Sequence, residues 1–248
     1  MKTFRLWIVA QVFAALACGC SGGSDDGTPS PVVEDPYLAA VADAKVATEE
    51  ERYDNLVPLV ESNRSLLWRT TAGQSEVLVG TWTSWAGYSD SVGKSVALSR
   101  EVWVNPAPLV QAFCQGSDLD GAPLVLRLEQ LLGLPSGDGK TLFVEFWVRP
   151  IDLFRPSPDP EITDTIADLT FPPGVDPAHR AWIESLQATS YGEGGYPWTR
   201  LGYTYDWGST VSEVGLSEFV IRSGATVSVE AVADTFAYCG KTAPSTQP

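Results

Sequence analysis

The sequence predicts a single α+β domain over residues 37–240, built from a mixed or antiparallel sheet and a few helices. The chain has 248 residues and is 44% hydrophobic, which is enough material for one sizeable core. Apolar runs of strand length occur beside segments of helical periodicity, without the regular alternation that predicts a parallel sheet. Glycine and proline are frequent between these runs and mark turns.

Four segments of the domain have the pattern of helices. Residues 37–55 repeat apolar positions at spacings of three and four, so one helix is expected there. Asp35 is placed to cap this helix, and Pro36 fits its first turn. Further helices are expected at residues 109–114, 124–132 and 179–188.

Strand patterns dominate the rest of the domain. The most apolar run is 140–148 (KTLFVEFWV), and turn-forming residues bound each of the other runs. These further strands are expected at residues 65–70, 76–85, 96–104, 199–207, 218–221 and 226–232. Residues 149–177 are rich in proline and acidic side chains, which predicts a long irregular loop.

The charge balance and the histidine count argue against nucleic-acid binding and against histidine-based metal sites. Asp and Glu number 31 against 16 Lys and Arg, giving a net charge of −15. Such a chain lacks the basic face that a nucleic-acid partner requires, so none is expected. A single histidine excludes metal sites that need two or more imidazoles, and no metal site is predicted. The acidic loop at residues 159–168 does not have the spacing of a calcium loop and reads as a solvated surface.

The first residues have the pattern of an export signal. Lys2 and Arg5 precede an apolar run at residues 6–17, interrupted by Gln11. A membrane-spanning helix needs about 20 apolar residues, so this run is too short to span and has the length of a secretory signal core. Residues 1–19 are therefore expected to be a signal peptide.

Two cysteines follow the apolar run in the sequence Leu16-Ala17-Cys18-Gly19-Cys20, before a Gly/Ser-rich stretch. This arrangement resembles the signal of bacterial lipoproteins. The resemblance implies that one cysteine receives a diacylglyceryl group and becomes the first residue of the mature chain. Cys20 is favoured, since cleavage before it removes Cys18 and leaves only one further pair of thiols. Cleavage before Cys18 stays open as the alternative.

The lipoprotein resemblance implies a place in the cell envelope, at the outer membrane or cell surface where the cell has two membranes, with the membrane as a partner through the lipid. Residues 20–36 are poor in large apolar side chains, which predicts a flexible tether after the lipid, and residues 241–248 are expected to be a disordered tail. Export also favours a disulfide between the remaining cysteines, Cys114 and Cys239.

Aromatic residues are dense between Tyr191 and Trp207 (YGEGGYPWTRLGYTYDW). Strand alternation places Tyr203, Tyr205 and Trp207 on one face. Such a face can stack against a flat ligand, or it can fill the core of the domain. Both interpretations stay open from the sequence, and these three residues are the candidate ligand-binding residues.

A second pattern runs through the strands. Arg69 lies in the apolar run Leu67-Trp68-Arg69-Thr70, a second strand reads EVWVN at 101–105, and Glu218 directly precedes FVI and the turn RSGAT. This order resembles the ADP-ribosyltransferase fold, although the second strand lacks that family's Ser-Thr-Ser. The resemblance implies that Arg69 holds a phosphate of NAD and that Glu218 stabilises an oxocarbenium-like transition state.

These patterns favour an envelope module that binds a ligand or a protein through the aromatic segment, without a cofactor. The alternative is an NAD-using enzyme with Arg69 and Glu218 as its catalytic residues. A carbohydrate hydrolase with two carboxylates is a more distant third possibility, for which no pair of acids can be chosen. His179 is the sole imidazole, without a nucleophile motif beside it, and reads as a local hydrogen-bond partner.

Overall fold

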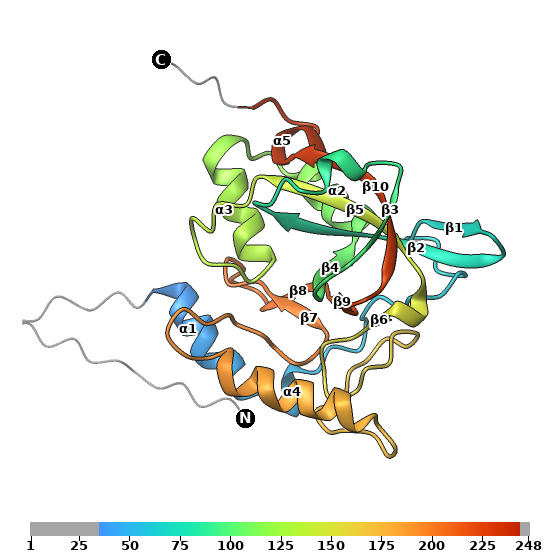
Figure 1. Cartoon of the computed structure of the whole chain (residues 1–248). Coiled ribbons are helices and arrows are strands. Elements are labelled where there is room, and N and C mark those ends of the chain that lie inside the picture. Colours follow the sequence, from blue (N-terminus) through green and yellow to red (C-terminus); the bar gives the residue numbers. More distant parts are fainter. Residues whose placement is uncertain (1–34, 244–248) are drawn as a thin grey trace, which may run out of the picture. The chain divides into compact units, whose positions relative to one another are not determined.

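A curved antiparallel sheet forms the centre of the computed structural model, which describes residues 35–243 (Figure 1). The sheet has eight strands in the order β3-β10-β5-β2-β4-β9-β6, with β1 paired to β2. Their bounds are β1 (Trp68–Thr71), β2 (Gln74–Thr83), β3 (Ser95–Ala97), β4 (Val102–Pro106), β5 (Leu142–Val148), β6 (Leu153–Phe154), β9 (Phe219–Ile221) and β10 (Thr226–Asp234). The predicted single α+β domain is therefore confirmed, and the sheet is antiparallel.

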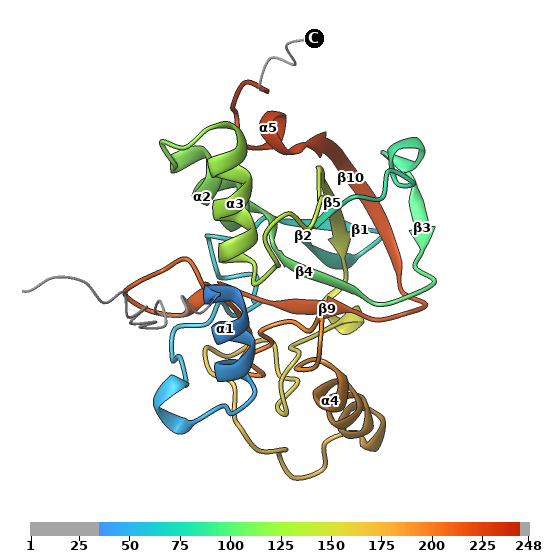
Figure 2. The ribbon, with the colours of Figure 1, turned by 90° about the vertical axis from the view of Figure 1, so that its left-hand side faces the viewer.

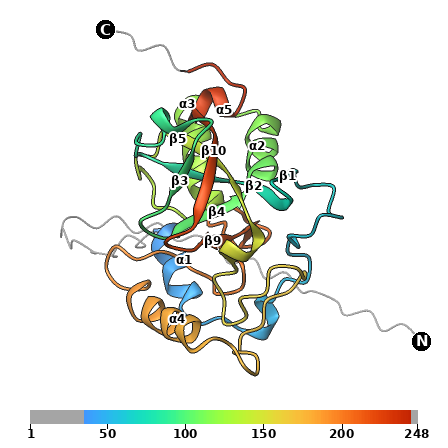
Figure 3. The ribbon, with the colours of Figure 1, turned by 45° about the vertical axis from the view of Figure 1, so that its right-hand side comes forward.

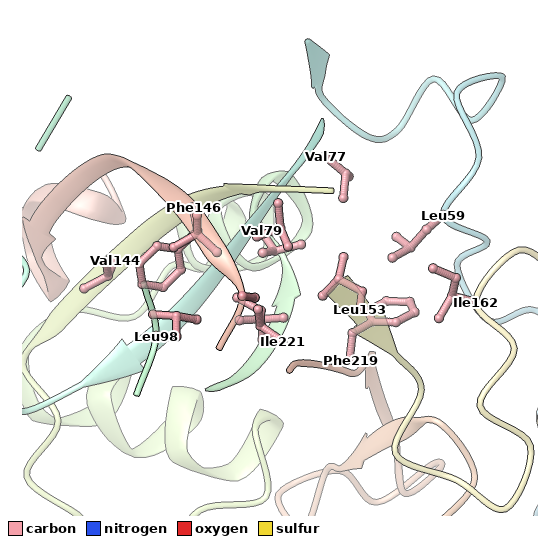
Figure 4. Packing of buried hydrophobic residues seen from close by; sticks show 14 of the residues in the cluster. Leu59, Val77, Val79, Leu98, Val144, Phe146, Leu153, Ile162, Phe219 and Ile221 are labelled. Carbon is pink, nitrogen blue, oxygen red and sulfur yellow. The ribbon is translucent and has the colours of Figure 1, made fainter. Parts of the chain in front are cut away.

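The sheet is curled, because two strands that are joined by a short turn are not neighbours in the sheet. β9 and β10 are joined by the short turn at residues 222–225, but β4, β2 and β5 lie between them. One face of the curled sheet encloses the main core, which includes Val79, Phe146 and Phe219 (Figure 4). Complete burial of each such side chain contributes roughly 1.5–3 kcal/mol of hydrophobic stabilisation.

Helices cover the other face of β2 and β5 (Figure 2). They are α2 (Ala107–Gly116), α3 (Gly121–Leu131) and the short α5 (Thr235–Tyr238). Phe143 stacks between the rings of Trp82 and Tyr238 at centroid distances of 5.6 and 4.1 Å. The predicted disulfide between Cys114 and Cys239 ties α2 to the end of α5. It closes a loop with a sequence separation of 125, for which chain entropy gives about 4–5 kcal/mol of stabilisation.

The remaining elements gather at one end of the sheet, where Figure 3 shows α1 (Pro36–Ala44) and α4 (Pro177–Thr189). The small hairpin of β7 (Tyr203–Tyr205) and β8 (Val214–Ser217) lies with them. Short 3-10 turns occur at η1 (Glu49–Glu51), η2 (Ser89–Ser91) and η3 (Pro150–Asp152). No helix within residues 35–243 has the length and apolar character needed to cross a membrane.

Several boundaries differ from the sequence-based expectations. The first helix does begin at Pro36 with the Asp35 side chain as its cap, but it ends at Ala44. Thr48 and Glu51 then form a capping box that starts a separate turn, so the helix does not reach residue 55. The strand expected at 96–104 is two strands, because the chain bends at residues 99–100 and β3 and β4 then pair with different strands, β3 with β10 and β4 with β2 and β9. Two strands are absent from the sequence-based expectations: β6, which lies within the segment 149–177 expected to be an irregular loop, and β8.

Some expectations fall on residues that the structure does not describe. The signal peptide at 1–19, the lipidated Cys20, the tether up to residue 34 and the tail from residue 244 all lie outside the described range.

One buried cation holds the proline-rich loop against the rest of the domain. Arg155 is fully buried, and its guanidinium donates to the carboxylate of Asp164 at 2.8 Å. It also donates to the backbone carbonyls of Ile166 and Asp164, at 2.7 and 3.0 Å. The side chain of Arg155 lies against Gly202, where an added Cβ would stand 2.6 Å from Arg155 Cδ. Gly202 also has a φ of +77°, so both space and backbone conformation require glycine here.

Replacing Arg155 by Ala should lower the free energy of unfolding by about 3–5 kcal/mol, because it leaves a cavity and two carbonyls without donors. Urea unfolding of the purified protein measures this loss. Arg180→Ala is the matched control, since Arg180 is half exposed, its ion pair with Glu184 is long at 4.0 Å, and its other contact is with the ring of Phe171, 3.9 Å away; together these contribute about 1–2 kcal/mol at most. A loss at Arg155 no larger than at Arg180 would contradict the structural role assigned to Arg155.

Candidate functional site

A cavity of about 380 Å³ lies between α4, the end of α3, the β7–β8 hairpin and the sheet. Its walls are mainly aromatic and aliphatic, and a single carboxyl group, that of Glu218, enters it. The lining comprises Trp103, Leu132, Gly133, Leu134, Lys140, Leu186, Ser190, Tyr196, Pro197, Trp198, Thr204, Tyr205 and Glu218. The cavity therefore combines apolar walls with one acid, drawn from segments far apart in the sequence.

Backbone contacts on both sides fix Glu218 between β8 and β9. Its own N–H donates to the carbonyl of Gly202 at 3.0 Å. The preceding carbonyl, that of Ser217, accepts from the Asn105 side chain at 2.9 Å, and the Ser217 hydroxyl accepts from the N–H of Val57 at 2.8 Å. The chain direction at Glu218 is thus set by hydrogen bonds to three other segments.

The end of α3 carries the β7–β8 hairpin. The hydroxyl of Thr204 donates to the carbonyl of Leu131 at 2.7 Å and accepts from the N–H of Leu216 at 2.9 Å. Arg127 on α3 forms two bonds to the buried Asp206 carboxylate, at 2.8 and 2.6 Å. These bonds hold the hairpin wall of the cavity in place next to the wall formed by residues 132–134.

The tryptophan wall rests on the proline-rich loop. Trp198 is buried, and its indole N–H donates to the carbonyl of Pro156 at 2.9 Å. Its ring meets that of Trp103 edge to face, with centroids 6.2 Å apart and an interplanar angle of 89°. Trp182 on α4 packs against both rings at 6.2 and 6.0 Å. The two tryptophans of the cavity therefore form a rigid corner.

The carboxyl group of Glu218 has no compensating partner. Among the described residues, no hydrogen bond or ion pair reaches its side-chain oxygens, and burial raises its pKa to about 8. The one basic residue of the lining, Lys140, forms an ion pair with Asp138. At neutral pH Glu218 is therefore mainly protonated and able both to donate and to accept a hydrogen bond.

Arg69 does not join Glu218 in this cavity. It lies on β1, where its guanidinium pairs with Glu76 of β2 at 2.6 Å and lies 4.8 Å from the ring centre of Trp147. Glu230 is 3.9 Å away. The two residues that the ADP-ribosyltransferase resemblance joins in one NAD site are thus separate here, and Arg69 takes part in a surface cluster.

The structure divides the three aromatic candidates. Tyr203 is 1% exposed, packs in the core and donates its hydroxyl to the carbonyl of Glu51 at 2.9 Å. Tyr205 lines the Glu218 cavity and donates to Asp43 of α1 at 2.8 Å. Trp207 lies beyond β7, in a turn, where it donates to the carbonyl of Leu134 and packs on Tyr37. Only Tyr205 therefore lies at the cavity.

His179 has the local role expected of it. Its ring is buried, with Nε2 2.8 Å from the carbonyl oxygen of Ser157, and burial lowers its pKa. Phe154 and Trp182 pack on the ring. In the acidic loop, Asp164 binds Arg155 and Asp168 binds Arg52. No group of residues within 35–243 has the arrangement of a metal site.

The sequence predicts two residues of the lining, Glu218 and Tyr205, but not that they share one cavity. Trp103 was assigned to a strand, and Trp198 to the aromatic segment, without any sign that the two rings meet. Leu134 and Leu186 lie near the ends of two helices. An apolar residue at such a position is common, so the sequence does not show that it lines a cavity. Two signals point to this place: the acid that directly precedes the apolar run at 219–221, and the aromatic segment that contains Tyr205.

No protein-family model, no curated protein and no solved structure matches this chain. The function therefore has to be inferred from the residues of the cavity.

The raised pKa of Glu218 makes a prediction for stability against pH. The folded protein keeps this proton up to about pH 8, whereas the unfolded chain releases it near the ordinary value of 4.5. Between these values the folded state binds one more proton, so a rise in pH favours unfolding by up to about 1.4 kcal/mol per pH unit. Glu218→Gln removes this contribution and should gain stability relative to the wild type as pH rises from 5 to 8.

Urea unfolding of both proteins at several pH values measures the difference. Below about pH 4.5 and above about pH 8 the difference should level off, because both states then carry the same charge at this residue. Two stability curves that run parallel from pH 5 to 8 would show that Glu218 ionises normally in the folded protein.

Proposed function

We propose that this protein is an exported lipoprotein that binds a small ligand in the Glu218 cavity. The observation that carries the proposal is the unpartnered carboxyl of Glu218 in a cavity of about 380 Å³ with aromatic and aliphatic walls. Binding sites for small molecules have this composition: mostly apolar walls with few polar groups that orient the ligand. Such sites have volumes of about 300 Å³ or more, so the cavity has room for a compact molecule.

If the cavity had only a structural role, an acid at residue 218 would reduce the stability of the fold without any benefit. Glu218 is half-buried, and removing an acid partly from water without giving it a partner lowers the stability of the fold. An apolar side chain at residue 218 would remove that cost. A titratable group whose pKa is strongly shifted, inside a cavity, is a feature that functional sites share.

The proposed location rests on the N-terminal sequence. The resemblance to bacterial lipoproteins gives Cys20 a lipid, and the segment that follows it leads to α1, which begins at Pro36. The Cys114–Cys239 disulfide agrees with an oxidising compartment such as the envelope. Lipoprotein processing adds more than one acyl chain, as firm anchoring requires.

The NAD-using alternative receives no support from the cavity. The lining holds Glu218 but no arginine, and its lysine is already paired with Asp138. A dinucleotide carries two phosphates, whose charges need cations or helix N-termini. The cavity walls offer apolar surface where such cations would be needed, which favours a ligand without phosphate groups.

A thermal-shift screen with the full-length protein tests ligand binding. The compounds are alcohols, monosaccharides, organic cations and organic anions at millimolar concentration. At 100 times its dissociation constant a ligand adds about 2.7 kcal/mol of stability. We expect at least one class to stabilise the wild type and to lose this effect in Leu186→Trp, in which an indole fills the cavity.

Ser185→Trp is the matched control. Residue 185 is exposed on the same helix and does not line the cavity, so this variant should keep the shift. The absence of any stabilising compound, or a shift that survives Leu186→Trp, would refute ligand binding in the cavity.

A further inference from the structure

The aromatic side chains of the cavity suggest the charge of its ligand. Trp103, Tyr196, Trp198 and Tyr205 all line it, and the two tryptophans meet at a right angle. The face of an aromatic ring carries partial negative charge and attracts cations, most strongly in tryptophan. Four such rings around one acid form an environment that favours positive charge.

The charged groups around Glu218 point the same way. The other titratable groups of the lining are Lys140, Tyr196 and Tyr205. Lys140 is neutralised by Asp138, and Asp138 in turn is held by its N–H, which donates to Glu129 at 3.0 Å. Burial and the bond to Asp43 raise the pKa of Tyr205, so this phenol stays neutral. Glu218 is therefore the one titratable group of the lining that has no partner, and it can pair with a cation once it releases its proton.

We propose that the ligand of the Glu218 cavity is an organic cation, an ammonium group with alkyl substituents that packs on Trp103 and Trp198 and pairs with the Glu218 carboxylate. This inference rests on the proposed function and specifies its ligand class. Alkyl groups match the apolar walls, whereas a bare metal ion or ammonium would lose its hydration without replacement. An anion would be repelled by the ionised carboxylate of Glu218.

The charge of the whole chain supports cation capture. The formal net charge of −15 attracts cations over the surface and raises their local concentration. This field acts on every cation alike, so it adds to the rate of encounter but does not select the ligand. Selection comes from the aromatic corner and from Glu218.

Binding of a cation and ionisation of Glu218 are linked. Because burial holds the acid protonated up to about pH 8, a cation that pairs with the carboxylate must displace its proton. Affinity should therefore rise about tenfold per pH unit between pH 5 and 8 and then level off. A neutral ligand that hydrogen-bonds to the protonated acid would bind with nearly constant affinity below about pH 8 and more weakly above it.

The test uses choline and its uncharged isostere 3,3-dimethyl-1-butanol, which differ in charge but hardly in shape. Calorimetric titration of the full-length protein at pH 9 should give at least tenfold tighter binding of choline. Titrations at pH 6.5 in buffers of different ionisation enthalpy should show release of close to one proton per choline bound. Release should fall toward zero at pH 9.5.

Two variants separate the carboxylate from general electrostatics. Glu218→Gln should weaken choline binding at pH 9 at least tenfold and leave binding of the isostere unchanged. Glu193→Gln removes the same charge from an exposed residue of the loop before Tyr196, outside the cavity lining, and should change choline binding less than twofold.

The outcomes distinguish this inference from the proposed function. Equal affinity for the two probes, proton uptake, or choline binding that survives Leu186→Trp would overturn the cation assignment. If choline fails to bind while a neutral or anionic compound binds in a manner lost in Leu186→Trp, the assignment is wrong and the ligand-binding cavity stands. If no compound binds, both proposals fall.

Discussion

The cavity depends on the buried guanidinium of Arg155. Its hydrogen bonds to Asp164 and Ile166 fold the proline-rich loop back on itself, while its alkyl chain fills the space that Gly202 leaves open. The next two residues then present the carbonyls that accept from Trp198 and contact His179, and Gly202 accepts from the N–H of Glu218. One buried cation thus orients the tryptophan wall, α4 and the acid. Breaking such a group destabilises strongly, since its partners are left buried without donors.

Stability and ligand binding make opposite demands at residue 218. The curled sheet, the helices α2 and α3 and the disulfide supply ample stabilisation elsewhere, so the fold tolerates one desolvated acid. Functional sites commonly depart in this way from what stability alone would select. The same desolvation that disfavours the charged carboxylate in the empty cavity strengthens its attraction for a cation once the two are paired.

The sequence was sufficient for the architecture and for two residues of the site, Glu218 and Tyr205. Apolar runs located β2, β5 and β10, because a strand buried in a sheet needs apolar side chains. The resemblance of the first residues to an export signal led to the prediction of the Cys114–Cys239 pair. Arg69 shows what the sequence alone could not reveal. Its guanidinium pairs with Glu76 on the neighbouring strand, and the alternation of residues along β1 gives no sign of this partner. The cavity walls were not predictable either, because Trp103, Leu134 and Trp198 meet only through the folding of distant segments. Tyr203 and Tyr205 alternate as a strand should, yet one fills the core and the other lines the cavity.

The central claim is that Glu218 is an acid held neutral in an apolar cavity. Its most direct measurement is a carbon-13 NMR titration of the glutamate carboxyl groups from pH 4 to 10, with Glu218→Gln identifying the resonance of interest. The account predicts a resonance, absent from the variant, that titrates with a midpoint near pH 8. A midpoint below about 5.5, within the ordinary range of exposed glutamates, would contradict it.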